Sequence, residues 1–174
     1  VSSTVEFNDV WWSTSGISWT QATDTAQWKA RDLHTSVVFD NKIWVIGGET
    51  SSNAGVNDVW WSTSGISWTQ ATDTAQWSKR YAHTSVVFDN KIWVIGGYDG
   101  AYKNDVWWST SGISWTQATD TAPWIGRDGL TSVVFDNKIW VIGGYDSTLN
   151  FKNDVWYSTN GISWTQATDT ALWT

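Results

Sequence analysis

Phe88-Asp89-Asn90-Lys91-Ile92-Trp93-Val94-Ile95-Gly96-Gly97 is the repeated segment around which this chain is built. It occurs three times, beginning at Phe39, Phe88 and Phe135. In each copy a short apolar run ends in Asp-Asn, and a second apolar run follows at once and ends in Gly-Gly. Asp and Asn tolerate the left-handed backbone of a tight two-residue turn, so the pattern predicts a β-hairpin.

A second repeated unit runs from Asn8 to Asp24 and recurs from Asn57, Asn104 and Asn153. β-branched and aromatic residues dominate both of its arms, as a packed, pleated surface prefers. Ser-Gly stands between the arms in three copies, and Asn160-Gly161 stands there in the fourth. The unit therefore predicts a second hairpin with a tight turn.

The two hairpins alternate with a nearly fixed period. If the first hairpin has strands a and b and the second has strands c and d, the order is c-d followed by a-b-c-d three times. The Asn-Asp units start 49, 47 and 49 residues apart. A period of this size with four strands predicts an all-β propeller of four-stranded antiparallel blades. We expect a single domain over residues 1–174, with a half blade at 8–24 and full blades at 28–73, 77–120 and 124–169.

This architecture predicts fourteen strands and essentially no helix. Stacked blades bury both of their faces, which explains why the apolar runs are nearly continuous rather than alternating. We therefore expect the following residues and their copies to be largely buried: Val37, Val38, Phe39, Ile43, Val45 and Ile46.

The composition argues against several classes of function. The net charge of −7 and the pI of about 4.5 disfavour a nucleic-acid partner, because an acidic surface repels phosphate backbones. The chain has no cysteine, so it has no disulfide and no thiolate metal site. It also lacks an apolar run of about 18 residues, so no membrane-spanning helix is expected. No cofactor or metal site is predicted.

Three recurring features resemble the kelch repeat: Gly-Gly at the end of strand b, Arg-x-x-His before strand a, and a single Trp late in the period. The Arg-x-x-His motif is present as Arg31/His34 and Arg80/His83, and the late Trp is Trp19, Trp68, Trp115 and Trp164. The chain is similar in particular to the Trp-rich, nearly identical kelch-like arrays of bacterial proteins. The last copy departs from the pattern, because Leu130 replaces the His. The resemblance implies a propeller with strand a innermost and strand d outermost, and binding far more often than catalysis.

Comparison of the repeats with each other predicts the binding face. The a–b and c–d turns should lie on one face and hardly vary. The b–c loops and d–a connections should lie on the other face, and they differ in length and content. Loops on a rigid scaffold are where recognition usually occurs. Four tyrosines of this variable face are candidate binding residues: Tyr81, Tyr98, Tyr102 and Tyr145.

Three further sets of side chains are candidates. Arg31, Arg80 and Arg127 precede the innermost strands, where they could ring the central channel and bind a carboxylate or phosphate, or tie the blades together. His34 and His83 could bind a metal or act as bases, or be structural. Trp28, Trp77 and Trp124 lie in the d–a connections, where they could stack on sugars or a protein partner, or pack between blades.

The function that follows is non-enzymatic recognition of a protein or a glycan through the variable face, with no catalytic residue. Two alternatives remain: a glycan-active, sialidase-like enzyme that uses the arginine ring, and a purely structural assembly unit. The enzyme requires a carboxylate pair or a Tyr/Glu nucleophile beside the arginines, and the only glutamates are Glu6 and Glu49.

The count of hairpins predicts a partner. The sequence has four c–d hairpins but three a–b hairpins, so the half blade lacks its inner strands. An unpaired strand edge and an uncovered apolar blade face are unstable in water. We therefore expect another polypeptide to complete the ring, either a second copy of the chain or the remainder of a longer propeller.

Overall fold

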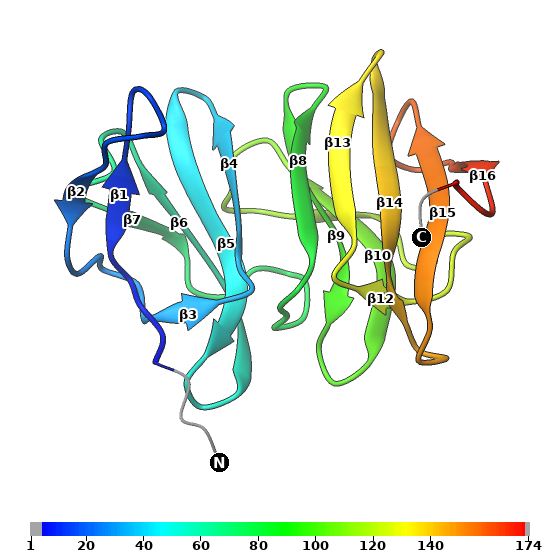
Figure 1. The fold of residues 1–174 in the computed structure, drawn as a ribbon, viewed down its shortest axis with the longest axis horizontal. Helices are drawn as coiled ribbons and strands as arrows, with labels where there is room; N and C mark the ends of the chain where they lie inside the picture. Colours follow the sequence, from blue (N-terminus) through cyan, green and yellow to red (C-terminus); the bar gives the residue numbers. More distant parts are fainter. Residues whose placement is uncertain (1–4, 173–174) are drawn as a thin grey trace.

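The computed structural model describes residues 5–172, and these residues form β-strands and loops without any helix (Figure 1). All fourteen expected strands are present among them. Two additional strands of two residues each, β3 (Arg31–Asp32) and β12 (Arg127–Asp128), lie in the d–a connections. No helix of the described residues has the length and apolar character needed to cross a membrane.

The strands form one half blade and three full blades, which we call the first, middle and last full blades. The half blade pairs β1 (Val10–Trp12) with β2 (Thr20–Thr23). The first full blade has the order β4 (Thr35–Phe39), β5 (Lys42–Thr50), β6 (Ala54–Ser62), β7 (Thr69–Thr72). The middle blade has the order β8 (Thr84–Phe88), β9 (Lys91–Tyr98), β10 (Tyr102–Ser109), β11 (Thr116–Thr119). The last has the order β13 (Thr131–Phe135), β14 (Lys138–Asp146), β15 (Phe151–Ser158), β16 (Thr165–Thr168).

The a–b turns have the predicted geometry. Asp40 and Asn41 have φ angles of 51° and 53°, and Phe39 pairs with Lys42 across the turn. Positive φ at both central residues defines the type I′ turn, whose twist matches that of the flanking strands. The copies at Asp89-Asn90 and Asp136-Asn137 have the same conformation. The turn residues alone therefore account for the three a–b hairpins.

The c–d connections differ from the expected tight turn. Residues 63–68 separate β6 from β7, so Ser64-Gly65 lies inside a wider loop. The Ser62 hydroxyl accepts a hydrogen bond from the Gly65 amide at 2.8 Å, and the Trp68 indole donates to the Gly65 carbonyl at 3.1 Å. These two side chains satisfy backbone groups that a two-residue turn would have paired, and this allows the longer loop.

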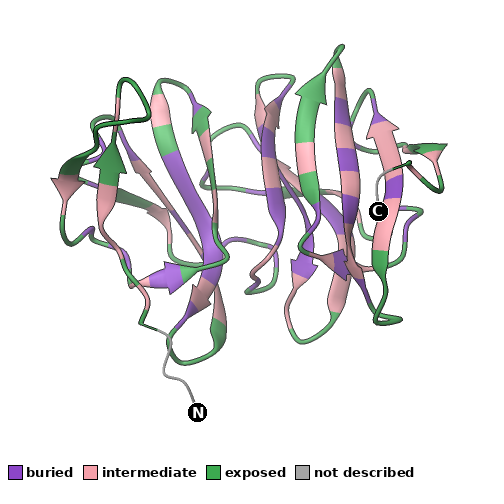
Figure 2. Ribbon diagram, viewed as in Figure 1, coloured by how far each residue is buried: buried purple, intermediate pink, exposed green. Residues whose placement is uncertain are grey.

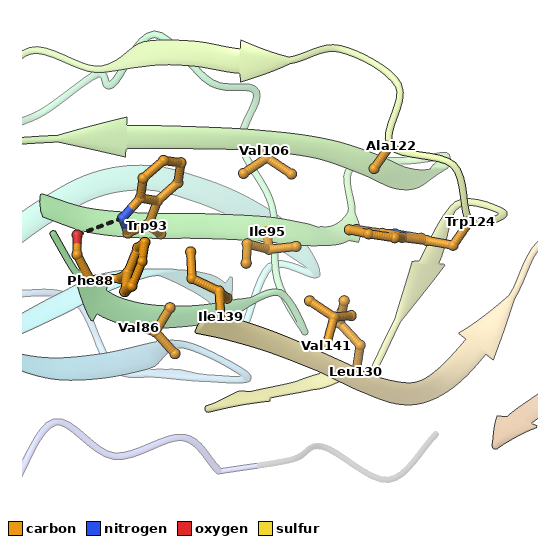
Figure 3. Packing of buried hydrophobic residues seen from close by; sticks show 10 residues of the cluster. All are labelled: Val86, Phe88, Trp93, Ile95, Val106, Ala122, Trp124, Leu130, Ile139 and Val141. Atoms are coloured by element: carbon orange, nitrogen blue, oxygen red, sulfur yellow. Dashed lines mark hydrogen bonds between the residues drawn. The ribbon is translucent and has the colours of Figure 1, made fainter. Parts of the chain in front are cut away.

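Apolar side chains of neighbouring blades form the core. Figure 3 shows Val86, Phe88, Trp93 and Ile95 of the middle blade facing Ile139 and Val141 of the last blade. The Trp93 indole also donates to the Phe88 carbonyl at 2.9 Å. The innermost strands β4, β8 and β13 lie side by side (Figure 1). This is the order of strands that the propeller prediction requires.

The burial prediction is correct for the middle blade and wrong at several positions of its two neighbours. Val87 is half-buried and Phe88 is buried, whereas Val38 of the first full blade and Phe135 of the last are each 71% exposed. Ile43, Val133 and Val134 are also exposed. Figure 2 shows the exposed residues on β13 and at the end of β4, with the more buried β8 between them. Val38 and Ile43 lie on the side of the half blade, which has only its c and d strands, and Val133 and Phe135 lie on the free face of the last blade.

Candidate functional site

The variable face lies along the lower edge of the molecule in Figure 1, where the b–c loops and the d–a connections meet. Each d–a connection pairs briefly with the end of strand b in its own blade. The cross-strand pairs are Asp32 with Glu49, Tyr81 with Tyr98, and Asp128 with Tyr145. The same repeat position therefore carries a different pair of side chains in each blade, on a backbone that the blade holds in place.

Five aromatic side chains form a continuous row across this face, which we call the tyrosine ridge: Tyr81, Tyr98, Tyr102, Tyr145 and Phe151. Ring centroids are 5.5 Å apart for Tyr81–Tyr98, 5.1 Å for Tyr98–Tyr102, 6.0 Å for Tyr102–Tyr145 and 5.1 Å for Tyr145–Phe151. These spacings are typical of interacting aromatic pairs. The four tyrosines are half-buried and Phe151 is 88% exposed. The structure thus joins the four candidate tyrosines into one pre-formed surface.

A hollow of about 350 Å³ lies beside the ridge. It separates the b–c loop of the first full blade from the rings of Tyr81 and Tyr98. Its other lining residues are Asn53, Ala54, Gly55, Lys79, Asp99 and Gly100. An opening of this size, walled by two phenol rings and by polar groups, suits a single side chain or sugar ring.

Carboxylates surround the ridge and influence its titration. Partial burial raises the pKa of the Tyr81 phenol, and the nearby Glu49 carboxylate raises it further. Partial burial also raises the pKa of Glu49, and the carboxylates of Asp32 and Glu6 add to the effect. Burial raises the pKa of Asp128 as well. The carboxylates of Glu49 and Asp128 therefore lie close enough to the ridge to influence the Tyr81 phenol.

The three arginines do not line the channel mouth. Arg31, Arg80 and Arg127 are 3%, 0% and 1% exposed. Each makes a two-pronged ion pair with the Asp of the Asn-Asp unit in its own blade, namely Asp58, Asp105 and Asp154. Each also donates to the carbonyl of the first Gly of Gly-Gly. Burial and these bonds leave the guanidinium groups no free face, so the ligand-binding alternative is wrong. The bonds also tie strands within one blade and do not join one blade to the next.

Each full blade thus repeats the same buried Arg–Asp ion pair beside a Gly-Gly that lies in strand b. Comparison with protein families agrees with this repeat. The sequence profile of the KLHDC2/KLHL20/DRC7 Kelch-repeats domain matches residues 2–171. The chain belongs to the kelch-repeat family. Kelch-repeat propellers are typically protein-interaction scaffolds. A search of curated proteins gives no match.

The tryptophans of the d–a connections are part of the packing between kelch blades. Trp28, Trp77 and Trp124 are 5%, 1% and 3% exposed. Each packs edge-on against the late Trp of the blade whose strand a follows it: Trp28 on Trp68, Trp77 on Trp115, and Trp124 on Trp164. Their burial removes them from the set of ligand-binding candidates.

The two histidines differ in their surroundings. His83 is 4% exposed, and its Nε2 lies 3.0 Å from the Thr35 hydroxyl. Burial lowers the pKa of His83 to about 3, and Arg80 contributes to this shift. His34 is exposed. In the described residues no group of three or more His, Cys, Asp or Glu side chains is placed to hold a metal ion.

The sequence did not single out three residues of the tyrosine ridge and its surroundings: Phe151, Glu49 and Asp128. Superposing the repeats would have found them. Phe151 and Tyr102 both stand before Lys-Asn-Asp, Asp128 and Tyr81 both follow the repeated Arg, and Glu49 and Tyr98 both follow Gly-Gly. The convergence of these positions on one surface depends on how the blades pack, which the sequence does not state.

Proposed function

We propose that this kelch-repeat domain is a non-enzymatic binding module that recognises a protein or a glycan with its tyrosine ridge. The observation that carries the proposal is the unbroken row of aromatic rings from Tyr81 to Phe151. Tyrosine offers a large, rigid contact area with a polar tip, and it is enriched in binding surfaces for that reason. The neighbouring hollow supplies the concave subsite that orients a ligand.

Glycan and peptide arrays probed with the intact protein test this proposal. We expect Tyr98→Ala/Tyr102→Ala to lose the signals that the wild type gives, because it interrupts the ridge at its centre. Ile66→Ala is the control, since Ile66 is an apolar residue with 55% exposure in the c–d loop of the first full blade, away from the ridge. Signals that both variants retain equally would refute the proposal.

We also infer that a second copy of the chain covers the open apolar face of the last blade. Val133, Phe135, Trp140 and Ile142 line an apolar hollow on the last blade. The equivalent residues of the middle blade, Val86, Phe88, Trp93 and Ile95, are buried against the next blade. The same side chains therefore form a blade-to-blade interface wherever the described chain supplies the partner surface.

The half blade at the other end is incomplete as well. β1 pairs only with β2 within the described residues. Asp9 corresponds to Asp58, Asp105 and Asp154, but its carboxylate accepts a hydrogen bond from Trp11 and no arginine reaches it there. An unpaired strand edge invites pairing with another chain.

Mass measurement by light scattering tests the association. We expect a species heavier than the 19.6 kDa chain, and we expect Phe135→Asp to lower its mass by placing a charge on the apolar hollow. The matched control is Phe151→Asp, at an aromatic residue that is also highly exposed but lies on the variable face. A stable 19.6 kDa wild-type species would refute association of two copies.

A further inference from the structure

The tyrosine ridge has an unusual electrostatic setting. Eight of the ten Lys and Arg side chains form ion pairs with Asp residues. The remaining two are Lys29 and Lys79, and Lys79 lines the hollow. Within residues 5–172 no Lys or Arg forms an ion pair with any of the carboxylates beside the ridge, which are Glu6, Asp32, Glu49 and Asp128.

These carboxylates flank the ridge on two sides. Asp32 and Glu49 are directly opposite each other on β3 and β5, and Glu6 is close enough to influence Glu49. Asp128 is opposite Tyr145 on β12 and β14, and it influences Tyr81 and Tyr102. Like charges opposite each other in a sheet destabilise it. A positively charged ligand would relieve this repulsion.

The rings themselves also favour a cation. The face of an aromatic ring attracts the ammonium of Lys and the guanidinium of Arg. The ridge presents several such rings in sequence, with carboxylates on both sides that can accept hydrogen bonds from the same cationic group. Anionic ligands are disfavoured by the surrounding carboxylates and by the net charge of −7.

We propose that the tyrosine ridge binds an extended peptide segment rich in Lys or Arg, whose side chains lie along the rings and pair with Glu49 and Asp128. This inference rests on the proposed function and assigns its ligand class. The hollow beside Tyr81 and Tyr98 receives one side chain of the segment, and its Asp99 is already paired with Lys103 at 2.8 Å. Among the carboxylates without such a pair, Glu49 and Asp128 are the two that influence the Tyr81 phenol directly.

The probe is a short fluorescein-labelled peptide of alternating Arg and Ser, with a matched peptide in which Gln replaces every Arg. Fluorescence anisotropy should show binding of the Arg peptide and none of the Gln peptide. Raising the salt from about 0.1 M to about 1 M, which shortens the Debye length from about 10 Å to about 3 Å, should weaken binding at least about tenfold. Glu49→Gln/Asp128→Asn should also weaken binding about tenfold, because two partly exposed charge pairs are lost.

Asp40→Asn/Asp136→Asn is the matched control for charge. It removes two carboxylates from exposed a–b turns, where they pair with Lys42 and Lys138, and Asn tolerates the positive φ found there. This control should bind the Arg peptide as the wild type does. The urea midpoint of each variant confirms folding, and Glu49→Gln/Asp128→Asn should be at least as stable as the wild type, because it removes like-charge repulsion.

The outcomes separate the two proposals. Failure of the Arg peptide to bind, or equal loss of affinity in the two charge variants, would overturn the basic-peptide inference. If a glycan or the Gln peptide binds instead, and Tyr98→Ala/Tyr102→Ala abolishes that binding, the ridge remains the site and its ligand is not basic. If the Arg peptide binds and the ridge variant has no effect, both proposals are refuted.

Discussion

Asp105→Asn tests the ion pair that holds strands a, b and c of the middle blade together. Arg80 is fully buried, and it reaches the two Asp105 oxygens at 2.7 and 2.8 Å. Its guanidinium also donates to the Gly96 carbonyl, the Ser78 carbonyl and the Ser78 hydroxyl. The substitution removes the only counter-charge of this guanidinium within the described residues while it leaves the side-chain volume almost unchanged.

The magnitude follows from the burial of the pair. Removing one partner of a buried ion pair costs about 3–5 kcal/mol, because the other charge stays desolvated. Asn retains one acceptor oxygen for Arg80, so we expect a loss near the lower end, about 3 kcal/mol. With a urea m-value of about 1–3 kcal/mol/M, this loss corresponds to a midpoint shift of about 1–3 M.

The half blade supplies a matched control at the equivalent repeat position. Asp9→Asn is the same chemical change, but Asp9 accepts a hydrogen bond only from the Trp11 indole among the described residues. We expect its stability to change by no more than about 0.5 kcal/mol. Urea unfolding of both variants, followed by tryptophan fluorescence, gives the comparison. Equal midpoints for the two variants would show that the buried arginine does not depend on its carboxylate.

Two further predictions concern a glycine and a histidine. Gly112→Ala should be less stable than Gly16→Ala by about 1–3 kcal/mol in urea unfolding. Both glycines have positive φ, but a Cβ at Gly112 would overlap the Trp44 indole, whereas Gly16 has open space around it. His83→Leu should reduce the loss of stability between pH 7 and about pH 5 by about 2 kcal/mol, measured by urea unfolding at both values. Burial lowers the folded-state pKa of His83 to about 3, so below pH 6.5 the unfolded chain gains a proton that the folded chain excludes. A comparable loss of stability in the Leu variant would show that His83 is not the group responsible.

The local elements of this propeller could be predicted from its repeated residues. The a–b turns follow from Asp40-Asn41 and its copies, because the left-handed conformation of two turn residues depends mainly on those residues. The four-strand period and the strand content follow in the same way from the repeated apolar runs. The c–d loops were harder to predict, since the bonds of the Ser62 hydroxyl and the Trp68 indole decide between a tight turn and a wide loop.

Burial and pairing were decided only by the tertiary structure. Thr-Ser-Val-Val-Phe has the same sequence in all three full blades, yet Phe39 and Phe88 are buried and Phe135 is 71% exposed. Arg80 stands beside strand a, but its carboxylate partner is 25 residues away on strand c. The tyrosine ridge joins residues from three separate segments. Local sequence fixes backbone conformation, whereas exposure, ion pairing and the convergence of side chains depend on which blades lie next to one another.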